Sequence, residues 1–256
     1  MKIIKKIFLI ITLTAIFSVS AFAKSGFEFH YNALIGVGVG FPTKSMKDLG
    51  FKNDFGFDGT SLFQLGYMNQ VREGFGISYL LELGYNISSY SIMGKPDINS
   101  LISAELDKYG LGNIDVSQLG ISTDVSISIY SYFYNIQIGL FPKFNFGNFS
   151  IGIGGGIKIP VAGEQTLVLL GNEYNQTLNR GDIVDFFNPP IFGYVKTSFN
   201  YSFYLIDKIA LDVGLYLGYD IIKFREETGK DEYGGTLNAG IVFGVKFGEK
   251  VDWFII

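Results

Sequence analysis

One histidine and no cysteine restrict the chemistry available to this chain of 256 residues. The absence of cysteine excludes thiol catalysis, disulfide bonds, Cys-ligated metals and lipid attachment at an N-terminal cysteine. His30 is the one candidate for classical acid–base catalysis, and a single histidine cannot build a histidine metal cluster. Seven charged residues lie, like His30, within segments that are otherwise apolar. They are Glu28, Glu82, Lys158, Lys196, Asp212, Asp220 and Lys246. Because these carboxylates are dispersed along the chain beside bases that can neutralise them, we expect no catalytic residue, no cofactor and no metal site.

These charged residues occupy alternate positions in segments that are otherwise apolar. From 27 to 41 the odd positions are mainly large and apolar, whereas the even positions include Glu28, His30 and Asn32, followed further on by glycines at 36, 38 and 40. A period of two indicates a β-strand with one apolar face and one polar or small face. The candidate residues therefore belong to the polar faces of the expected strands.

The same alternation predicts eight strands. They cover 27–41, 61–67, 77–87, 130–141, 149–161, 191–203, 209–221 and 237–247. The connections between them are alternately long and short, with the long ones at 42–60, 88–129, 162–190 and 222–236. Alternating connection lengths are typical of an up-and-down barrel in an outer membrane, where short turns face the periplasm and long loops face outside.

A soluble sandwich or a lipocalin-like barrel would show the same alternation of apolar and polar residues along its strands. The placement of the aromatic residues distinguishes a membrane barrel from these two folds. Aromatic residues gather at both ends of the apolar faces, with aliphatic residues between them, as lipid-facing strands require. One set is Phe27, Phe29, Tyr67, Tyr79, Phe149, Phe199, Tyr201, Phe203 and Phe247, and the other is Phe41, Tyr85, Tyr130, Tyr132 and Tyr219. A mean hydropathy of +0.28 with only 17% charged residues also argues against a soluble enzyme. We therefore expect an all-β fold, an eight-stranded antiparallel up-and-down transmembrane β-barrel.

A targeting signal precedes the expected barrel. Lys2, Lys5 and Lys6 come before the apolar run 7–19, and Ala21 and Ala23 supply the small residues that signal peptidase accepts. An uncleaved anchor helix is the alternative, but it needs about 18 apolar residues or more. We expect residues 1–23 to be a signal peptide and residues 24–256 to be the outer-membrane β-barrel domain, with a net charge of 17 − 24 = −7. A negative chain is unsuited to nucleic acid, which needs a basic face.

In its signal, strands, aromatic girdles and loop lengths the chain resembles the small outer-membrane β-barrels of the OmpX, OmpW and opacity-protein type. The resemblance implies insertion by the outer-membrane assembly machinery, which favours a terminal aromatic on the last strand. Phe243 and Phe247 fit that pattern, although the chain continues to Ile256. The exported N-terminus and the even strand count predict that both termini are periplasmic and that the long loops are extracellular. We expect a monomer surrounded by outer-membrane lipid.

The inward charges should pair, because an unpaired charge in a narrow lumen is costly. Glu28 and Lys246 are expected at the same depth on adjacent strands, and Lys196 and Asp220 in the upper half of two neighbouring strands. His30 is expected at the periplasmic end as a lumen residue with satisfied hydrogen bonds. The network of Glu28, His30, Glu82, Lys158, Lys196, Asp212, Asp220 and Lys246 either fills and stiffens the barrel or lines a narrow path for ions.

The long loops are expected to carry the whole net charge of −7. In the second loop a helical spacing from Leu101 to Tyr109 predicts a short helix, and in the third loop residues 166–178 predict a hairpin that extends the wall. Arg180, Gly181 and Asp182 match the tripeptide that integrins recognise, which makes them a possible surface recognition site.

Three classes of function remain. A structural or adhesion barrel with surface-exposed loops is favoured, with host surface or matrix proteins as possible partners. A narrow porin-like channel for ions or small solutes is the alternative, and an outer-membrane enzyme is the third.

Overall fold

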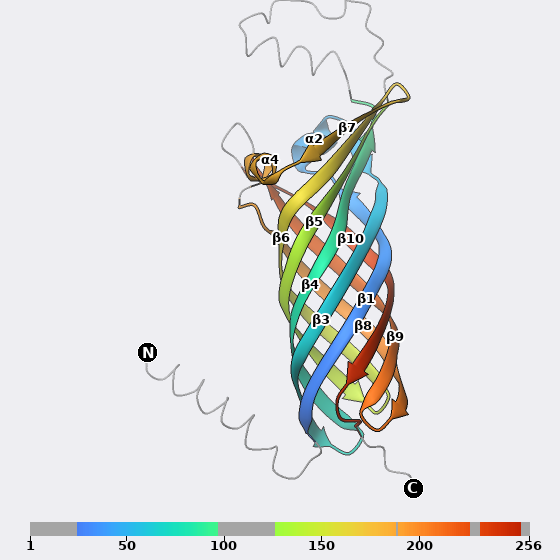
Figure 1. Cartoon of the computed structure of the whole chain (residues 1–256). Coiled ribbons are helices and arrows are strands. Elements are labelled where there is room, and N and C mark those ends of the chain that lie inside the picture. The colour runs from blue at the N-terminus through green and yellow to red at the C-terminus, as the bar shows by residue number, and fades with distance from the viewer. Residues whose placement is uncertain (1–24, 97–125, 188, 226–230, 252–256) are drawn as a thin grey trace, which may run out of the picture.

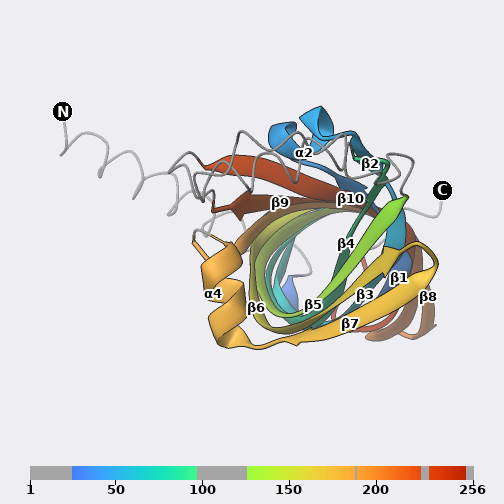
Figure 2. The same cartoon turned by 90° about the horizontal axis from the view of Figure 1, so that it is seen from above.

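The computed structural model describes residues 25–96, 126–187, 189–225 and 231–251. Its strands form one closed antiparallel barrel, tall and narrow in Figure 1 and seen along its axis in Figure 2. The expected signal peptide and the expected short helix near residues 101–109 lie outside the described residues.

The wall consists of eight strands, and two further strands lie outside the ring. The wall strands are β1 (Gly26–Phe41), β3 (Phe55–Arg72), β4 (Phe75–Gly94), β5 (Ile127–Phe146), β6 (Phe149–Leu169), β8 (Phe192–Ile206), β9 (Ile209–Phe224) and β10 (Glu232–Phe247). The additional strands are β2 (Phe51–Asn53), paired with β4, and β7 (Asn172–Leu178), paired with β6.

Pairing between the first and last strands closes the ring, as the sequence predicted. Phe29 lies opposite Phe247 and Phe41 opposite Gly235 on β1 and β10. From β10 the order runs through β9, β8, β6, β5, β4 and β3 back to β1, so each wall strand has two neighbours. A closed ring satisfies the backbone hydrogen bonds that lipid cannot satisfy. The fold class is therefore an eight-stranded antiparallel transmembrane β-barrel.

The two ends of the barrel differ. The end that we call the turn end holds the tight connections 73–74, 147–148 and 207–208, as well as the described chain ends near Ser25 and Val251. The opposite end, the loop end, holds both short helices and the hairpin of β6 and β7 (Figure 1).

Alternate side chains give the outer surface its apolar character. Val37, Leu81 and Leu215 are among the aliphatic residues exposed on it. Near the turn end Phe27 meets Tyr67 edge to face, with ring centroids 5.6 Å apart. Nearer the loop end Phe41 lies 6.2 Å from Tyr219. Aliphatic residues between two aromatic girdles match a surface that faces lipid.

Several strands are longer than the sequence analysis predicted. β3 begins at Phe55 rather than at residue 61, and β5 continues to Phe146 rather than ending at residue 141. Asp58 and Lys143, which we had assigned to a loop and a turn, are therefore inward-facing wall residues. With Asp58 in the wall, the long loops carry −6 rather than −7, and the buried charges carry the remaining −1.

At the loop end, several short elements and strand ends pack together into a small unit that we call the head. It comprises α2 (Lys44–Asp48), β2, β7, α4 (Arg180–Phe186) with the following Phe187, and the loop-end parts of β4, β5, β6, β8 and β9. Its apolar core consists of Tyr90, Ile92, Phe133, Leu178, Ile183, Phe187, Phe192 and Ile222. Within the described ranges, no helix is long and apolar enough to cross a membrane.

Candidate functional site

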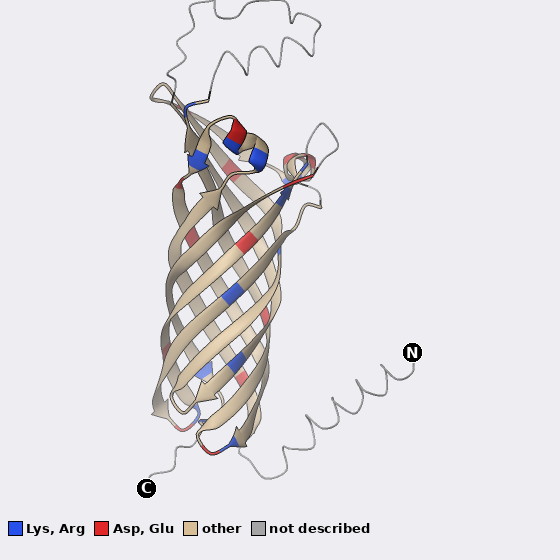
Figure 3. Ribbon diagram, turned by 180° about the vertical axis from the view of Figure 1, so that it is seen from behind, with Lys and Arg blue, Asp and Glu red and all other residues tan. Residues whose placement is uncertain are grey.

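Ten buried ionisable groups of Asp, Glu, Lys and His line the lumen. They are Glu28, His30, Asp58, Glu82, Lys143, Lys158, Lys196, Asp212, Asp220 and Lys246. All eight residues that the sequence placed in the lumen are inside it. Asp58 and Lys143 were missed, although each keeps the inward parity of its strand, with Thr60 and Gln64 on β3 and with Gln137 and Asn145 on β5. Charged ribbon segments are spaced along the height of the wall in Figure 3.

The layer nearest the turn end is built around Glu28. Lys246 Nζ lies 2.5 Å from Glu28 Oε1, which is the ion pair expected from adjacent strands. His30 Nε2 lies 3.5 Å from Glu28, and His30 Nδ1 lies 3.4 Å from Asp212. Lys143 Nζ is 3.5 Å from the same Nδ1. His30 is thus enclosed by charged partners inside the wall, where its side chain is buried.

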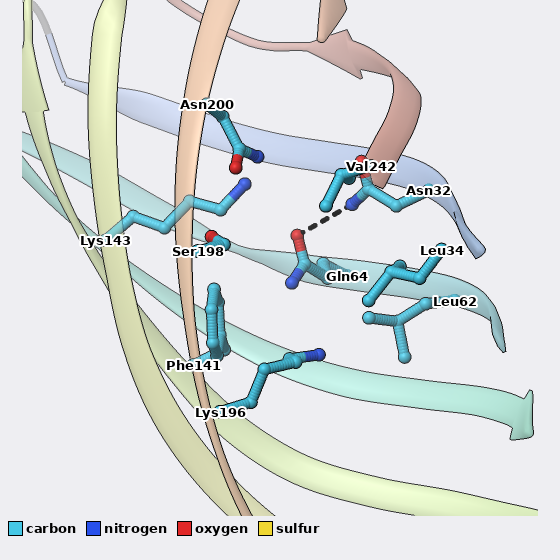
Figure 4. A pocket seen from close by; sticks show the side chains of 10 residues that line it. All are labelled: Asn32, Leu34, Leu62, Gln64, Phe141, Lys143, Lys196, Ser198, Asn200 and Val242. Atoms are coloured by element: carbon cyan, nitrogen blue, oxygen red, sulfur yellow. Dashed lines mark hydrogen bonds between the residues drawn. The ribbon is translucent and has the colours of Figure 1, made fainter. Parts of the chain in front are cut away.

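The middle layer is built around Glu82. Lys196 Nζ lies 2.9 Å from Glu82 Oε1, and the hydroxyl of Tyr194 donates to Oε2 at 2.8 Å. Gln64 donates to Glu82 at 2.6 Å. Gln64 also accepts a hydrogen bond from Asn32, which Figure 4 shows as a dashed line. Every oxygen of this carboxylate therefore has a donor, as a buried charge requires.

The partner of Lys196 differs from our expectation. Strands β8 and β9 are neighbours, but their register places Tyr194 opposite Asp220 and Lys196 opposite Gly218. Lys196 instead reaches across the lumen to Glu82 on β4 and lies 4.8 Å from the ring centre of Phe141. The length of the Lys196 side chain, which spans the lumen, therefore determines its partner, and the adjacency of strands does not.

The layer nearest the loop end contains two aspartates. Lys158 Nζ lies 2.7 Å from Asp220 Oδ2, which also accepts from Asn238 at 3.0 Å. Asp58 accepts from the hydroxyl of Tyr216 at 2.6 Å and from Asn86 at 3.2 Å. Asp58 is thus hydrogen-bonded by neutral groups.

Little space remains in the lumen. One cavity, of about 10 Å³, lies between Asn32, Lys143 and Lys196 (Figure 4), and another, of about 20 Å³, lies beside Asp58 and Asp220. Each has room for about one water molecule. At the loop end, the apolar head core lies over the polar layers. Arg225 N, directly after β9, donates to Phe186 O of α4 at 2.9 Å.

Among the described residues, no group of three or more His, Cys, Asp or Glu is placed so that it could hold a metal ion. The lumen residues of the middle and loop-end layers form hydrogen bonds with one another, which is the arrangement of a network that fills the barrel.

Arg180, Gly181 and Asp182 form the first turn of α4. The Asn179 side chain caps this helix, and the Asp182 carboxylate accepts a hydrogen bond from the Asn179 amide at 2.8 Å. The Arg180 guanidinium donates to the carbonyl of Pro160. The two charged groups of the tripeptide are therefore engaged by the chain itself, one as a helix cap and one as a tether to β6.

The expected hairpin in the third loop is present. β6 and β7 pair from Gly163 opposite Leu178 to Leu169 opposite Asn172, and Leu170 and Gly171 form the turn. Both turn residues have positive φ, 52° and 79°, which is the geometry of a two-residue hairpin turn that favours asparagine and glycine. Leu170 is exposed at the tip.

No protein-family model and no curated protein sequence matches the chain. Among solved structures, Ail, the attachment invasion locus protein of Yersinia pestis in complex with the heparin analogue sucrose octasulfate, is 10% identical, with a TM-score of 0.28 over 85% of this chain and 98% of Ail. The outer-membrane protease OmpT of Escherichia coli is 10% identical, with a TM-score of 0.33 over 88% and 96%. Neisserial surface protein A is 11% identical, with a TM-score of 0.30 over 88% and 98%.

These are small outer-membrane β-barrel proteins, the class that the sequence resembles. At 10–11% identity they assign neither an activity nor a ligand to this chain. The ring of strand pairings and the apolar belt identify the chain as an eight-stranded transmembrane β-barrel of the outer-membrane type.

Proposed function

We propose that this barrel acts at the cell surface through its head, with the loop end outside and both termini in the periplasm, and that its lumen is a filled support rather than a passage. The cavities inside are of the size of one water molecule, and the ion pairs at Glu82 and Asp220 cross the remaining space. Recognition is usually placed on segments held by a rigid scaffold. The chain is accordingly proposed to bind a partner rather than to catalyse a reaction.

The observation that carries this proposal is the height of the wall above the lipid. A transmembrane β-strand needs about 9–11 residues, whereas β4 and β5 have 20 residues each and β6 has 21. The additional residues of these strands lie at the loop end, where they form part of the head and of its apolar core. Such a core would be unnecessary if the loops only closed the barrel.

Strand β7 is an exposed edge of the head. It pairs with β6 alone among the described strands, and its residues from Asn172 to Thr177 are all exposed. Exposed edges are normally protected by charged side chains, lysine above all, by proline or by a bulge. The segment 172–177 has one charge, Glu173, contains no lysine or proline, and pairs with β6 without a bulge. This free edge suits an extended segment of a host surface or matrix protein, added as a further strand.

The register shows which backbone groups face that edge. In a two-residue hairpin the closing pair, here Leu169 and Asn172, is hydrogen-bonded, and bonded pairs alternate along the ladder. Tyr174 and Gln176 therefore bond to β6, while Asn175 directs its N–H and C=O toward the free edge. Proline at 175 removes a donor from this edge and leaves the hairpin ladder intact.

The test compares Asn175→Pro with Asn175→Ala on cells that display the protein, with immobilised fibronectin and laminin as probes. We expect Asn175→Pro to lose binding and Asn175→Ala to keep it. Deletion of 164–177 should also abolish binding while the barrel stays heat-resistant. Unchanged binding after that deletion contradicts the proposal. Stable single-channel currents in planar bilayers would favour the narrow channel instead.

Arg180, Gly181 and Asp182 remain a second candidate contact in the head. Because both charged side chains are held by the chain, an integrin would have to displace them before binding. Arg180→Lys and Asp182→Glu in the same assay separate this contact from the β7 edge.

A further inference from the structure

The outer surface of the barrel carries a groove on the side formed by β6, β8, β9 and β10. Its volume is about 350 Å³, far larger than either lumen cavity and within the range of about 300–1,000 Å³ that is usual for ligand sites. Six side chains at outward positions line it, namely Ile153, Val195, Thr197, Leu217, Tyr219 and Leu237. The groove therefore lies outside the lumen, in the surface that faces lipid.

The strand register explains how these six side chains meet. They form two adjacent rows across the strands, one of Ile153, Thr197 and Leu217 and one of Val195, Tyr219 and Leu237. Residues directly opposite each other on adjacent strands are neighbours on the same face of the sheet. The side chains of Val195 and Thr197 on β8 are shorter than those beside them on β6 and β9, which leaves the depression along β8.

The lining of the groove carries no charge. Lys196 also borders it, but this residue occupies an inward position, and its ammonium group lies 2.9 Å from Glu82 in the lumen. The Thr197 hydroxyl donates to the carbonyl of Gly152 at 2.9 Å, so it requires no partner in the groove. The surface that remains suits an apolar chain better than a charged group.

The groove extends from the aromatic girdle near the loop end into the aliphatic part of the belt. Tyr219 belongs to that girdle, where its ring lies 6.2 Å from Phe41. Leu217 and Ile153 continue the groove toward the turn end, and both are exposed in the isolated barrel. Because aromatic girdles lie at the level of the lipid head groups, a chain that enters beside Tyr219 and follows the groove has the course of a lipid acyl chain.

An acyl chain and the wall of a second barrel are the two occupants to compare at this depth. Lipid tails are as apolar as leucine, so association within the bilayer depends on van der Waals packing. A flexible chain can lie in the groove and contact it on several sides. A second copy related by a two-fold axis through this face would set one groove opposite the other and leave both empty. The shape of the surface therefore favours the acyl chain.

We propose that this groove binds one acyl chain of a phospholipid, with the ester end beside Tyr219 and the chain along β8. The site continues the lipid-facing belt, but it holds its lipid more firmly than the rest of the belt does. A chain in the groove contacts protein on several sides, whereas a chain on the surrounding surface contacts it on one side.

Photo-crosslinking tests the site in a bilayer. The full-length protein is folded into phosphatidylcholine vesicles that contain a small fraction of phosphatidylcholine with a diazirine on one acyl chain. After irradiation, mass spectrometry locates the labelled residues. We expect several-fold more label at the six groove residues than at Val37, an outward residue of β1 that is as exposed as Val195, at 55% each. Label spread evenly around the belt overturns the proposal.

A matched pair of variants assigns the label to the groove. Val195→Trp places a large side chain in the groove, and Val37→Trp makes the same change on the lipid-facing surface of β1. We expect Val195→Trp to lower the label on β6 and β9 several-fold and Val37→Trp to leave it unchanged. Equal labelling of these strands in both variants contradicts the site. If Val195→Trp does not become heat-resistant, the distribution of label on the wild-type protein decides the question without it.

Single cysteines test the competing occupant, because the chain has no cysteine of its own. In the same vesicles under oxidising conditions, Val195→Cys should form no more disulfide-linked dimer than Val37→Cys does. Dimer formation through position 195 alone would mean that a second copy covers the groove, which refutes the lipid site.

Discussion

Lys246 and Glu28 meet 2.5 Å apart on the two strands that close the barrel, and both side chains are buried. Removal of one partner of such a pair leaves a charge that neither water nor a counter-ion compensates, at a cost of about 3–5 kcal/mol. Lys246→Met should therefore lower the unfolding temperature clearly, and Lys246→Met with Glu28→Gln should recover part of the loss. Thermal unfolding of the four combinations gives the coupling energy.

A solvent-exposed pair provides the control for that cycle. Lys208 and Glu249 lie 2.7 Å apart at the turn end, with Lys208 largely exposed. Exposed pairs contribute about 0–1 kcal/mol, so Lys208→Met should hardly change Tm. Additive effects of the Lys246 and Glu28 substitutions would mean that the buried pair does not form.

The number of strands and the closing pair were predictable from sequence because alternation is a local property. Phe29 and Phe247 lie opposite each other in this pairing, which follows from the inward and outward alternation of residues and from strand direction. Lys196 with Glu82 was not predictable, because a contact across the lumen depends on barrel diameter and on side-chain reach. Asp58 and Lys143 were missed because glycines, charges and Pro142 nearby resemble a loop or a turn, although the inward parity continues through both residues.

Val37 tests the orientation of the first strand. It lies on the outer surface near mid-strand and is 55% exposed in the isolated barrel, which places it against lipid. Arginine on the lipid face at mid-membrane costs about 2–4 kcal/mol. Val37→Arg should reduce assembly, measured as the fraction of heat-resistant protein in the outer-membrane fraction, whereas Val37→Leu should assemble normally. Normal assembly of Val37→Arg would mean that this face does not contact lipid.

Ile183 tests whether the head and the barrel unfold separately. Its side chain is fully buried in the head core, so Ile183→Asp places a charge among apolar residues. We expect protease cleavage within 179–191 at low protease concentration, with little change in the thermal unfolding of the barrel. Val184→Asp, at an exposed position on the same helix, should remain resistant. A barrel that unfolds together with the head in Ile183→Asp would show that the two parts form one cooperative unit.

Glu232 makes the attachment of α2 dependent on pH. Its carboxylate accepts hydrogen bonds from the Ser45 amide at 3.0 Å and the Ser45 hydroxyl at 2.9 Å. Hydrogen bonds, from the Thr43 side chain first and then from the Ser45 amide, lower the pKa of Glu232 below its ordinary value of 4.5. Because the folded-state pKa is the lower one, this stabilisation is complete above pH 4.5 and is lost as the pH falls through the folded-state pKa. The Ser45 amide resonance should therefore titrate with a midpoint below 4.5 in wild type and not at all in Glu232→Gln, and a midpoint at or above 4.5 would mean that the carboxylate does not bind this amide in solution.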